Sequence, residues 1–316
     1  MLPYIWKGVD AMIDMKTLLD LQLTIFIMIL AGYWMTKKGF LTPDARKPLS
    51  DVLINFIIPC NIVLSFMIEM NQDILRDTLL VLVISLIIQL ITPIMGMMLY
   101  PKATVKESAV LRYGTVVSNA GYMGNPIAFG LFGNLGLLYA SVYLIPQRIV
   151  VWTAGVSYFT GVKGKGVWRK IAFHPCLIAV YIGLILMITQ FTLPTGVVKA
   201  LTHGSNSVTA ISMIVIGNIL AGIKLDSLIT KQTLWYSFVR LIMIPGLVLI
   251  TCILFGLSPL VTTIATLLAG MPAGATTAIL AAQHHGDDVL AAKIVFVSTV
   301  LSLLTVPMFG VLTNLL

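Results

Sequence analysis

Apolar stretches of about 20 residues, the length that a helix needs to cross a bilayer, recur along this chain from one end to the other. Thr78–Tyr100 and Thr233–Gly256 are the clearest of them. Charged residues make up only 10% of the chain, against about 25% in a soluble domain. We therefore predict an all-α integral membrane protein with ten transmembrane helices, at approximately residues 17–36, 46–68, 77–100, 108–132, 135–160, 173–193, 197–223, 232–256, 259–283 and 288–315.

The basic residues predict how these spans are oriented, because lysine and arginine are concentrated in cytoplasmic connections. Of the 20 basic residues, 14 lie in connections that follow odd-numbered spans, and 4 lie before the first span or after even-numbered spans. The odd-numbered connections are therefore expected in the cytoplasm, and both termini outside it, in a multi-pass protein of the cell membrane. The excess of lysine and arginine lies in short connections between spans, so it does not indicate a nucleic-acid partner. The partner expected for these spans is the lipid bilayer.

Ten spans divide into two halves of five, residues 1–160 and 161–316, joined at the basic stretch Gly161–Lys170. A second half that begins after an odd number of spans is inserted upside down, as in transporters built from inverted repeats. Ser118–Phe129 in span 4 holds two asparagines, two glycines and a proline, and Ala269–Gly274 in span 9 holds Pro272. We expect spans 4 and 9 to be broken at these points and to cross near their prolines.

The crossing is the predicted substrate site, because a helix that breaks inside a membrane frees backbone groups that need polar surroundings. The N-terminal ends of helices carry partial positive charge and bind anions. Proline-interrupted spans at equivalent positions of two inverted halves point to a transporter's binding site. The candidate substrate-binding residues in the two breaks are Asn119, Gly121, Asn125, Pro126, Met271, Pro272 and Ala273.

Arg148 and Arg240 lie inside spans, and no Asp or Glu lies within the core of any span to pair with them. An unpaired charge in a bilayer is costly, so each arginine is expected to face a water-filled cavity, backbone carbonyls or an anionic ligand. Arg148 lies roughly 20 Å along span 5, too deep to reach the interface easily, and is added to the candidate site. Arg240 is about two turns from the cytoplasmic end and can reach it. The missing carboxylates favour an anion at the crossing over a tightly coupled cation.

The motif Asn119-x-Gly-x-x-Gly-x-Pro126 in span 4 resembles the crossover signature of the auxin efflux carrier family. The family includes plant PIN-type carriers and prokaryotic carriers of organic acids such as malonate or malate. The likeness covers nearly the whole chain. Further segments that are similar to the family's pattern are Gly32-Tyr-x-x-x-Lys-x-Gly39, Pro59, Met271-Pro272, Ala281-Ala-Gln-His-His-Gly-Asp-Asp288, Ser298-Thr-x-x-Ser302 and Pro307.

The resemblance implies a scaffold of spans 1, 2, 6 and 7, through which a homodimer forms. It implies a transport domain of spans 3–5 and 8–10 that moves as a rigid unit in an elevator mechanism. It also implies that a substrate carboxylate lies near Asn119 and Asn125 and that Gln147 contributes to the site. We therefore predict a secondary transporter of small organic anions, such as mono- or dicarboxylates or auxin-like acids, without a cofactor or a metal.

Two alternatives stay open. One is a Na⁺- or H⁺-coupled symporter of a related inverted-repeat fold, and the other is a membrane sensor that binds the ligand without transporting it. An enzyme is not expected, because the sequence holds no HExxH, GxSxG or phosphate-loop motif. The polar stretch His284-His-Gly-Asp-Asp288 is expected to be a solvated turn in which an aspartate caps span 10.

Overall fold

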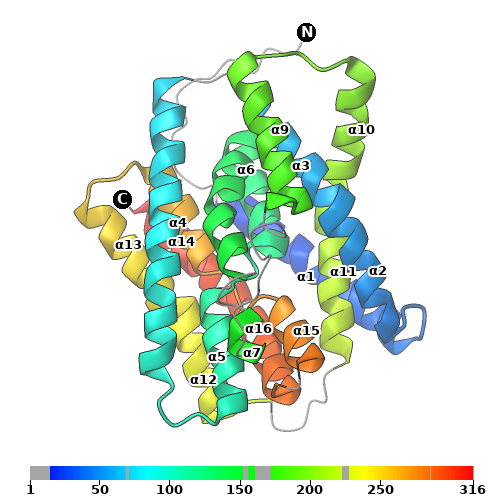
Figure 1. The fold of residues 1–316 in the computed structure, drawn as a ribbon, viewed down its shortest axis with the longest axis vertical. Helices are drawn as coiled ribbons and strands as arrows, with labels where there is room; N and C mark the ends of the chain where they lie inside the picture. The colour runs from blue at the N-terminus through cyan, green and yellow to red at the C-terminus, as the bar shows by residue number, and fades with distance from the viewer. Residues whose placement is uncertain are drawn as a thin grey trace.

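The computed structural model of the chain (Figure 1) describes residues 15–68, 71–151, 156–160, 172–222, 228–284 and 286–315. Within these ranges the regular elements are helices, and the only extended pairing is one antiparallel bridge between Ser118 and Ala273. The all-helical prediction is confirmed for this part of the chain. In order, the elements are α1 (Met15–Lys37), η1 (Pro43–Ala45), α2 (Arg46–Val52), η2 (Leu53–Ile57), α3 (Ile58–Ser65), α4 (Gln72–Leu99), α5 (Val105–Val116), η3 (Ala120–Gly124), α6 (Asn125–Val150), α7 (Val156–Thr160), α9 (Pro175–Thr189), α10 (Thr195–Asn206), α11 (Val208–Ala221), α12 (Lys231–Phe238), η5 (Val239–Met243), α13 (Ile244–Leu254), α14 (Pro259–Ala269), α15 (Thr276–Gln283) and α16 (Asp288–Asn314).

Seven helical stretches of the described chain are long and apolar enough to cross a membrane, judged by length and composition. Two further apolar helices, α9 and α14, are shorter. The longest of the seven, Ala120–Val150, is interrupted at Gly133, whose φ of 58° and ψ of −145° are not helical. A Cβ atom on Gly136 would overlap the carbonyl oxygen of Ala128, although eight residues of straight helix would separate the two by about 12 Å. The chain therefore folds back at Gly133, between the predicted fourth and fifth spans.

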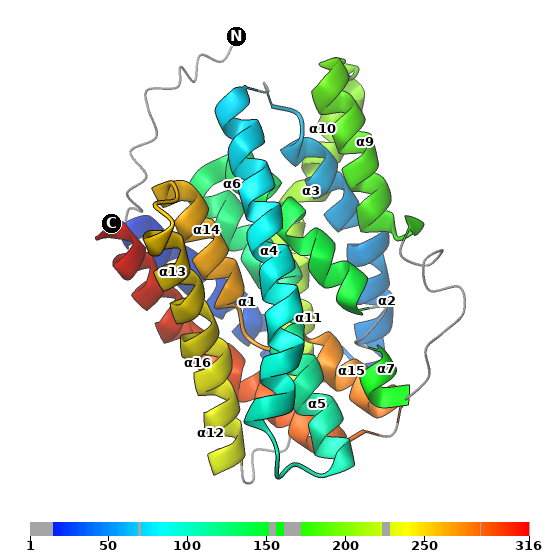
Figure 2. The same ribbon diagram turned by 60° about the vertical axis from the view of Figure 1, so that its left-hand side comes forward.

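The helices pack mainly within two groups. In the first group, α1 lies along α11, and α3 packs on α9 and α10. In the second group, α4 packs on α5 and α6, α13 packs on α14, and α12, α14 and α15 pack on α16. Figure 2 shows α13, α14 and α16 on one side of α4, and α2, α3, α9 and α10 on the other.

Three of the interrupted helices share one local device, a π-helical turn of five residues that ends two residues before a proline. Proline lacks an N–H, and its ring clashes with the carbonyl four residues earlier. A wider π turn moves that carbonyl aside, so the helix continues with a local bulge instead of ending. The three pairs are Leu53–Ile57 before Pro59, Ala120–Gly124 before Pro126, and Val239–Met243 before Pro245.

The contact between α1 and α11 is made backbone to backbone through two glycines. A Cβ atom on Gly32 would overlap the carbonyl oxygen of Ile214, and one on Gly217 would overlap that of Ile29. Small residues allow this close approach where lipid gives helices no hydrophobic reason to associate. The Asn218 side chain secures the same contact by donating to Thr36 Oγ1 at 2.9 Å and to the Thr42 carbonyl at 3.1 Å.

We expect Gly217→Ala to destabilise the protein by about 1–3 kcal/mol, because the added methyl group meets backbone atoms that cannot rotate away. The measurement is thermal unfolding of the purified protein in detergent. Gly246→Ala in α13 is the matched control, since a Cβ there meets nothing within 4 Å. The control should be neutral or slightly more stable, and equal melting temperatures for the two variants would contradict the tight α1–α11 contact.

Candidate functional site at the crossing of two broken helices

The candidate site is built around the point where two interrupted helices cross. Beyond the ends of α5 and α14 the backbone is extended, and the two extended segments pair. The Asn119 N–H donates to the Pro272 carbonyl at 2.8 Å, and the Gly274 N–H donates to the Val117 carbonyl at 3.0 Å. The two breaks therefore satisfy part of each other's backbone, as non-helical segments inside a membrane must.

The sequence predicted that the two broken helices cross near Pro126 and Pro272. In the structure Pro272 does take part, but its partner segment is at Ser118 and not at Pro126. Pro126 is the second residue of α6 and has no N–H for the carbonyl of Tyr122, four residues earlier. That carbonyl instead accepts a hydrogen bond from the Ser212 hydroxyl of α11 at 3.3 Å. The carbonyl freed by Pro126 thus links the bulged helix to α11. The break in the helix lies before Pro126, at Ser118.

Arg240 is the charged residue at the crossing. Its side chain is buried, with 2% of the residue exposed, and its guanidinium donates to three backbone carbonyls. Nε bonds to Met271 at 2.9 Å, Nη1 to Thr115 at 3.0 Å and Nη2 to Ala269 at 2.8 Å. The carbonyls of Thr115 and Ala269 belong to the C-terminal ends of α5 and α14, and that of Met271 lies two residues beyond α14. The last carbonyls of a helix have no intrahelical partners and carry partial negative charge. The sequence left three environments open for Arg240: a water-filled cavity, backbone carbonyls or an anionic ligand. In the structure its guanidinium faces backbone carbonyls.

The charge balance at the crossing is positive. Four helix ends meet there: α5 and α14 end, while the helix of η3 and α6 and the helix α15 begin. Each end carries about half an elementary charge, negative where a helix ends and positive where it begins. Arg240 offsets the two negative ends, so about one positive charge remains. The described residues between 108 and 284 contain no Asp or Glu that would cancel it.

Two polar side chains from neighbouring helices hold the breaks in place. Gln147 of α6 accepts from the Ser118 hydroxyl at 2.9 Å and donates through Nε2 to the Ser118 carbonyl at 2.8 Å. Ser298 of α16 accepts from the Ala273 N–H at 3.1 Å. The structure therefore brings Gln147 to the crossing, where its amide is already engaged. Ser118 and Ser298 were not among the candidate residues, although Ser298 lies in a motif that carries the family resemblance and Ser118 directly precedes another.

Asn125 is a buried polar residue at this site whose side chain has no hydrogen-bond partner among the described residues, and the hydroxyls of Thr266 and Thr277 are two further such groups. Asn125 is 1% exposed, and neither Oδ1 nor Nδ2 has a hydrogen-bond partner among the described residues. Leaving such an atom unpaired costs about 1–3 kcal/mol, so it needs an explanation. Helical side chains lean toward the N-terminus, which places the amide over the turn that contains Gly121. A Cβ on Gly121 would meet nothing within 4 Å, so the backbone one turn before Asn125 has room beside it.

Arg148 does not join this cluster. It follows Gln147 in α6 and therefore points about 100° away around the helix. Its charge acts on His174 and Cys176 at the start of α9. Its Nη1 is buried and has no hydrogen-bond partner in the part of the chain that the structure describes. Contact of Arg148 with a substrate stays a prediction.

The other polar clusters of the sequence are placed more simply. Among the described residues, no group of three His, Cys, Asp or Glu side chains lies together as metal ligands would. Asp287 accepts from the Leu290 N–H at 2.8 Å and caps α16. The predicted aspartate cap is therefore confirmed.

The described chain holds seven apolar helical stretches of membrane-crossing length, and two broken helices, α5 with α6 and α14 with α15, meet at a crossing that carries Arg240. This arrangement is typical of multi-pass membrane transporters. The chain belongs to the family described as membrane transport protein, whose sequence profile matches residues 18–166 and 164–310. The two matches meet in the basic stretch at which the sequence divides into halves.

Three relatives are transporters by name. An uncharacterized transporter of Methanothermobacter thermautotrophicus is 25% identical over 294 residues, 92% of this chain and 96% of the relative. An uncharacterized transporter of Methanocaldococcus jannaschii is 22% identical over 307 residues, 92% of this chain and 97% of the relative. A protein of Rhizobium meliloti named "Putative malonate transporter" is 22% identical over 213 residues, 64% of this chain and 66% of the relative.

Proposed function

We propose that the protein is a secondary carrier of small organic anions, with the substrate carboxylate beside the crossing at Asn119, Gly121 and Asn125. One observation carries this proposal. Arg240 occupies the carbonyls of the two negative helix ends, so the two positive ends are left to act on a ligand. The unpaired amide of Asn125 supplies donors and an acceptor at the same place.

The fold that goes with this function has ten spans in two inverted halves of five. The seven long apolar stretches become eight when Ala120–Val150 is divided at Gly133. The helix α9 and the broken pair α14 and α15 supply the ninth and tenth. Ten spans place both termini on one side, and the distribution of basic residues favours the outside of the cell membrane.

Transport then proceeds by an elevator motion of one helix group against the other. The group of α1, α3, α9, α10 and α11 is the scaffold and the place of homodimer contact. The group of α4–α6 and α12–α16 carries the crossing. This division is supported by the packing of each group mainly on itself, and the seam between them is formed by α1, α3 and α11 on one side and η3, α6 and α16 on the other.

The substrate class is supported by the charge balance and by the name of the Rhizobium relative, which specifies malonate. A net charge of about one fits a single carboxylate at the crossing. A dicarboxylate then needs a second partner for its other end. Coupling to Na⁺ is the less favoured mode, because the described residues between 108 and 284 offer only neutral oxygens as ligands.

The test is Asn119→Ala in proteoliposomes, with flux and binding measured for a panel of labelled mono- and dicarboxylates. We expect at least a tenfold loss of affinity, or about 1.4 kcal/mol, at normal expression. Asn206→Ala, at an exposed position at the end of α10, is the matched control and should behave as wild type.

Other results would overturn parts of the proposal. Wild-type affinity in Asn119→Ala would remove this residue from the site. Binding without flux across the whole panel would identify a sensor instead of a carrier. Flux that follows an imposed Na⁺ or pH gradient would identify a coupled symporter.

A further inference from the structure

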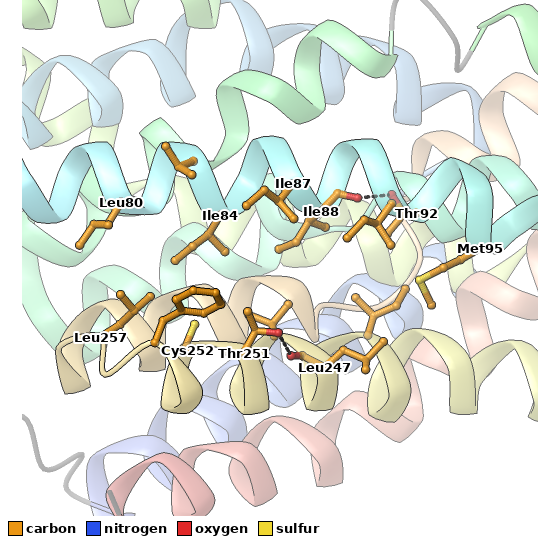
Figure 3. A pocket seen from close by; sticks show the side chains of 15 residues that line it. Leu80, Ile84, Ile87, Ile88, Thr92, Met95, Leu247, Thr251, Cys252 and Leu257 are labelled. Carbon is orange, nitrogen blue, oxygen red and sulfur yellow. Dashed lines mark hydrogen bonds between the residues drawn. The ribbon is translucent and has the colours of Figure 1, made fainter.

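A cavity of about 350 Å³ lies between α4 and α13, away from the crossing (Figure 3). Its size is within the range of small-molecule sites, about 300–1,000 Å³. Figure 3 shows the side chains of the two helices directed toward each other across the gap. The labelled ones are Leu80, Ile84, Ile87, Ile88, Thr92 and Met95 from α4, and Leu247, Thr251, Cys252 and Leu257 from α13 and the turn after it.

The chemistry of the walls suits a hydrocarbon chain. The two hydroxyl groups of the lining are already used, since Thr92 donates to the Ile88 carbonyl at 2.8 Å and Thr251 to the Leu247 carbonyl at 2.7 Å. The cavity therefore offers no free hydroxyl to a carboxylate, and it is not a second seat for the transported anion. An apolar ligand meets no unpaired polar group here.

The cavity is open toward the bilayer along its length. Val83 is 49% exposed, Ile87 47% and Leu247 50%, all on its rim. From Leu80 to Met95 the wall of α4 is about 22 Å long, more than half of the hydrocarbon thickness of about 30 Å. A lipid chain can therefore enter sideways and lie along the groove.

A cluster of charged groups stands at one end of the cavity, one helical turn before Leu80. Arg76 Nη2 lies 3.4 Å from Asp77 Oδ1, and the Arg76 side chain is 65% exposed. Asp77 Oδ2 accepts from the Ser258 hydroxyl at 3.2 Å, and Ser258 follows the lining residue Leu257. The exposed Asp73 lies in the same first turns of α4. Both signs of charge are thus available where a lipid head group would stand.

We propose that the cavity and this cluster bind one membrane phospholipid of the phosphatidylethanolamine type. One acyl chain lies between α4 and α13, the phosphate lies beside Arg76, and the ammonium group lies beside Asp73. A primary ammonium group donates three hydrogen bonds, which suits a carboxylate. The quaternary amine of phosphatidylcholine donates none, and phosphatidylglycerol has no cation for Asp73. This site is independent of the transport proposal.

The experiment counts lipids retained by the delipidated full-length protein in native mass spectrometry, with phosphatidylethanolamine, phosphatidylcholine and phosphatidylglycerol of identical acyl chains. We expect one phosphatidylethanolamine per chain, retained at least fivefold better than the other two. Leu247→Trp, which fills the cavity from its exposed rim, should reduce retention at least tenfold. Leu90→Trp, 70% exposed on α4 but outside the lining, is the matched control and should retain the lipid.

The head-group contacts are tested by Asp73→Asn and Arg76→Gln, each of which should reduce the preference for phosphatidylethanolamine at least threefold without changing the melting temperature. Equal retention in Leu247→Trp and Leu90→Trp would overturn the cavity as the acyl site. Equal retention of the three lipids by the wild type, or a preference for phosphatidylglycerol, would overturn the head-group assignment. Ile84→Trp, on the opposite wall, repeats the test if Leu247→Trp lowers the melting temperature.

Discussion

Arg240→Met is expected to lower the free energy of unfolding by about 3–5 kcal/mol and to abolish transport. The substitution removes three hydrogen bonds at once and leaves the carbonyls of Thr115, Ala269 and Met271 buried without that donor. It also returns the two negative helix ends to the crossing, where they cancel the positive ends that attract the anion. Thermal unfolding in detergent measures the first effect, and flux of a labelled carboxylate in proteoliposomes measures the second.

Two further substitutions separate charge from geometry at Arg240. Arg240→Lys keeps the charge but not the planar fork that reaches three carbonyls, so it should lose much of the stability as well. Arg76→Met is the matched control, because that side chain is 65% exposed, and it should change stability by no more than about 0.5 kcal/mol. An Arg240→Met protein with wild-type melting temperature and flux would contradict the neutralising role.

The sequence predicts the helical membrane architecture well because polarity inside an apolar chain is conspicuous. Ser118–Phe129 and Ala269–Gly274 interrupt apolar runs, and the structure places a break at each. It predicts the position of the first break less well. Pro126 looks like the breaking residue, yet a π turn accommodates it and the chain is extended earlier, at Val117 and Ser118. That conformation depends on pairing with a segment from the other half, which no local pattern encodes.

The two intramembrane arginines illustrate a second limit. Depth along a helix can be counted from the sequence, and by that measure Arg148 is the better candidate for the substrate site. The direction of a side chain around the helix depends on which neighbour packs there. Arg240 reaches the crossing, whereas the charge of Arg148 acts on the start of α9. Gln147 directly precedes Arg148 in α6, and its side chain bonds to Ser118 at the crossing. The rotation of about 100° between consecutive residues of a helix therefore directs Arg148 away from the crossing.

Asn125→Ala is expected to weaken substrate binding at least tenfold, about 1.4 kcal/mol, while the melting temperature stays the same or rises. Neither Oδ1 nor Nδ2 of Asn125 has a partner among the described residues, so truncation breaks no hydrogen bond. It removes an unpaired buried amide and introduces a residue with higher helix propensity. Isothermal binding of carboxylates and thermal unfolding of the same preparation measure the two quantities together.

Gln147→Ala provides the opposite case at the same crossing, which makes the pair decisive. Its amide is engaged at 2.9 Å and 2.8 Å with Ser118, so its loss should lower stability by about 1–3 kcal/mol. Loss of an amide that binds the ligand should thus lower substrate affinity, whereas loss of an amide that holds the break should lower the melting temperature. If Asn125→Ala instead loses stability and keeps full affinity, its amide holds the break open, and the substrate seat must be sought elsewhere along the crossing.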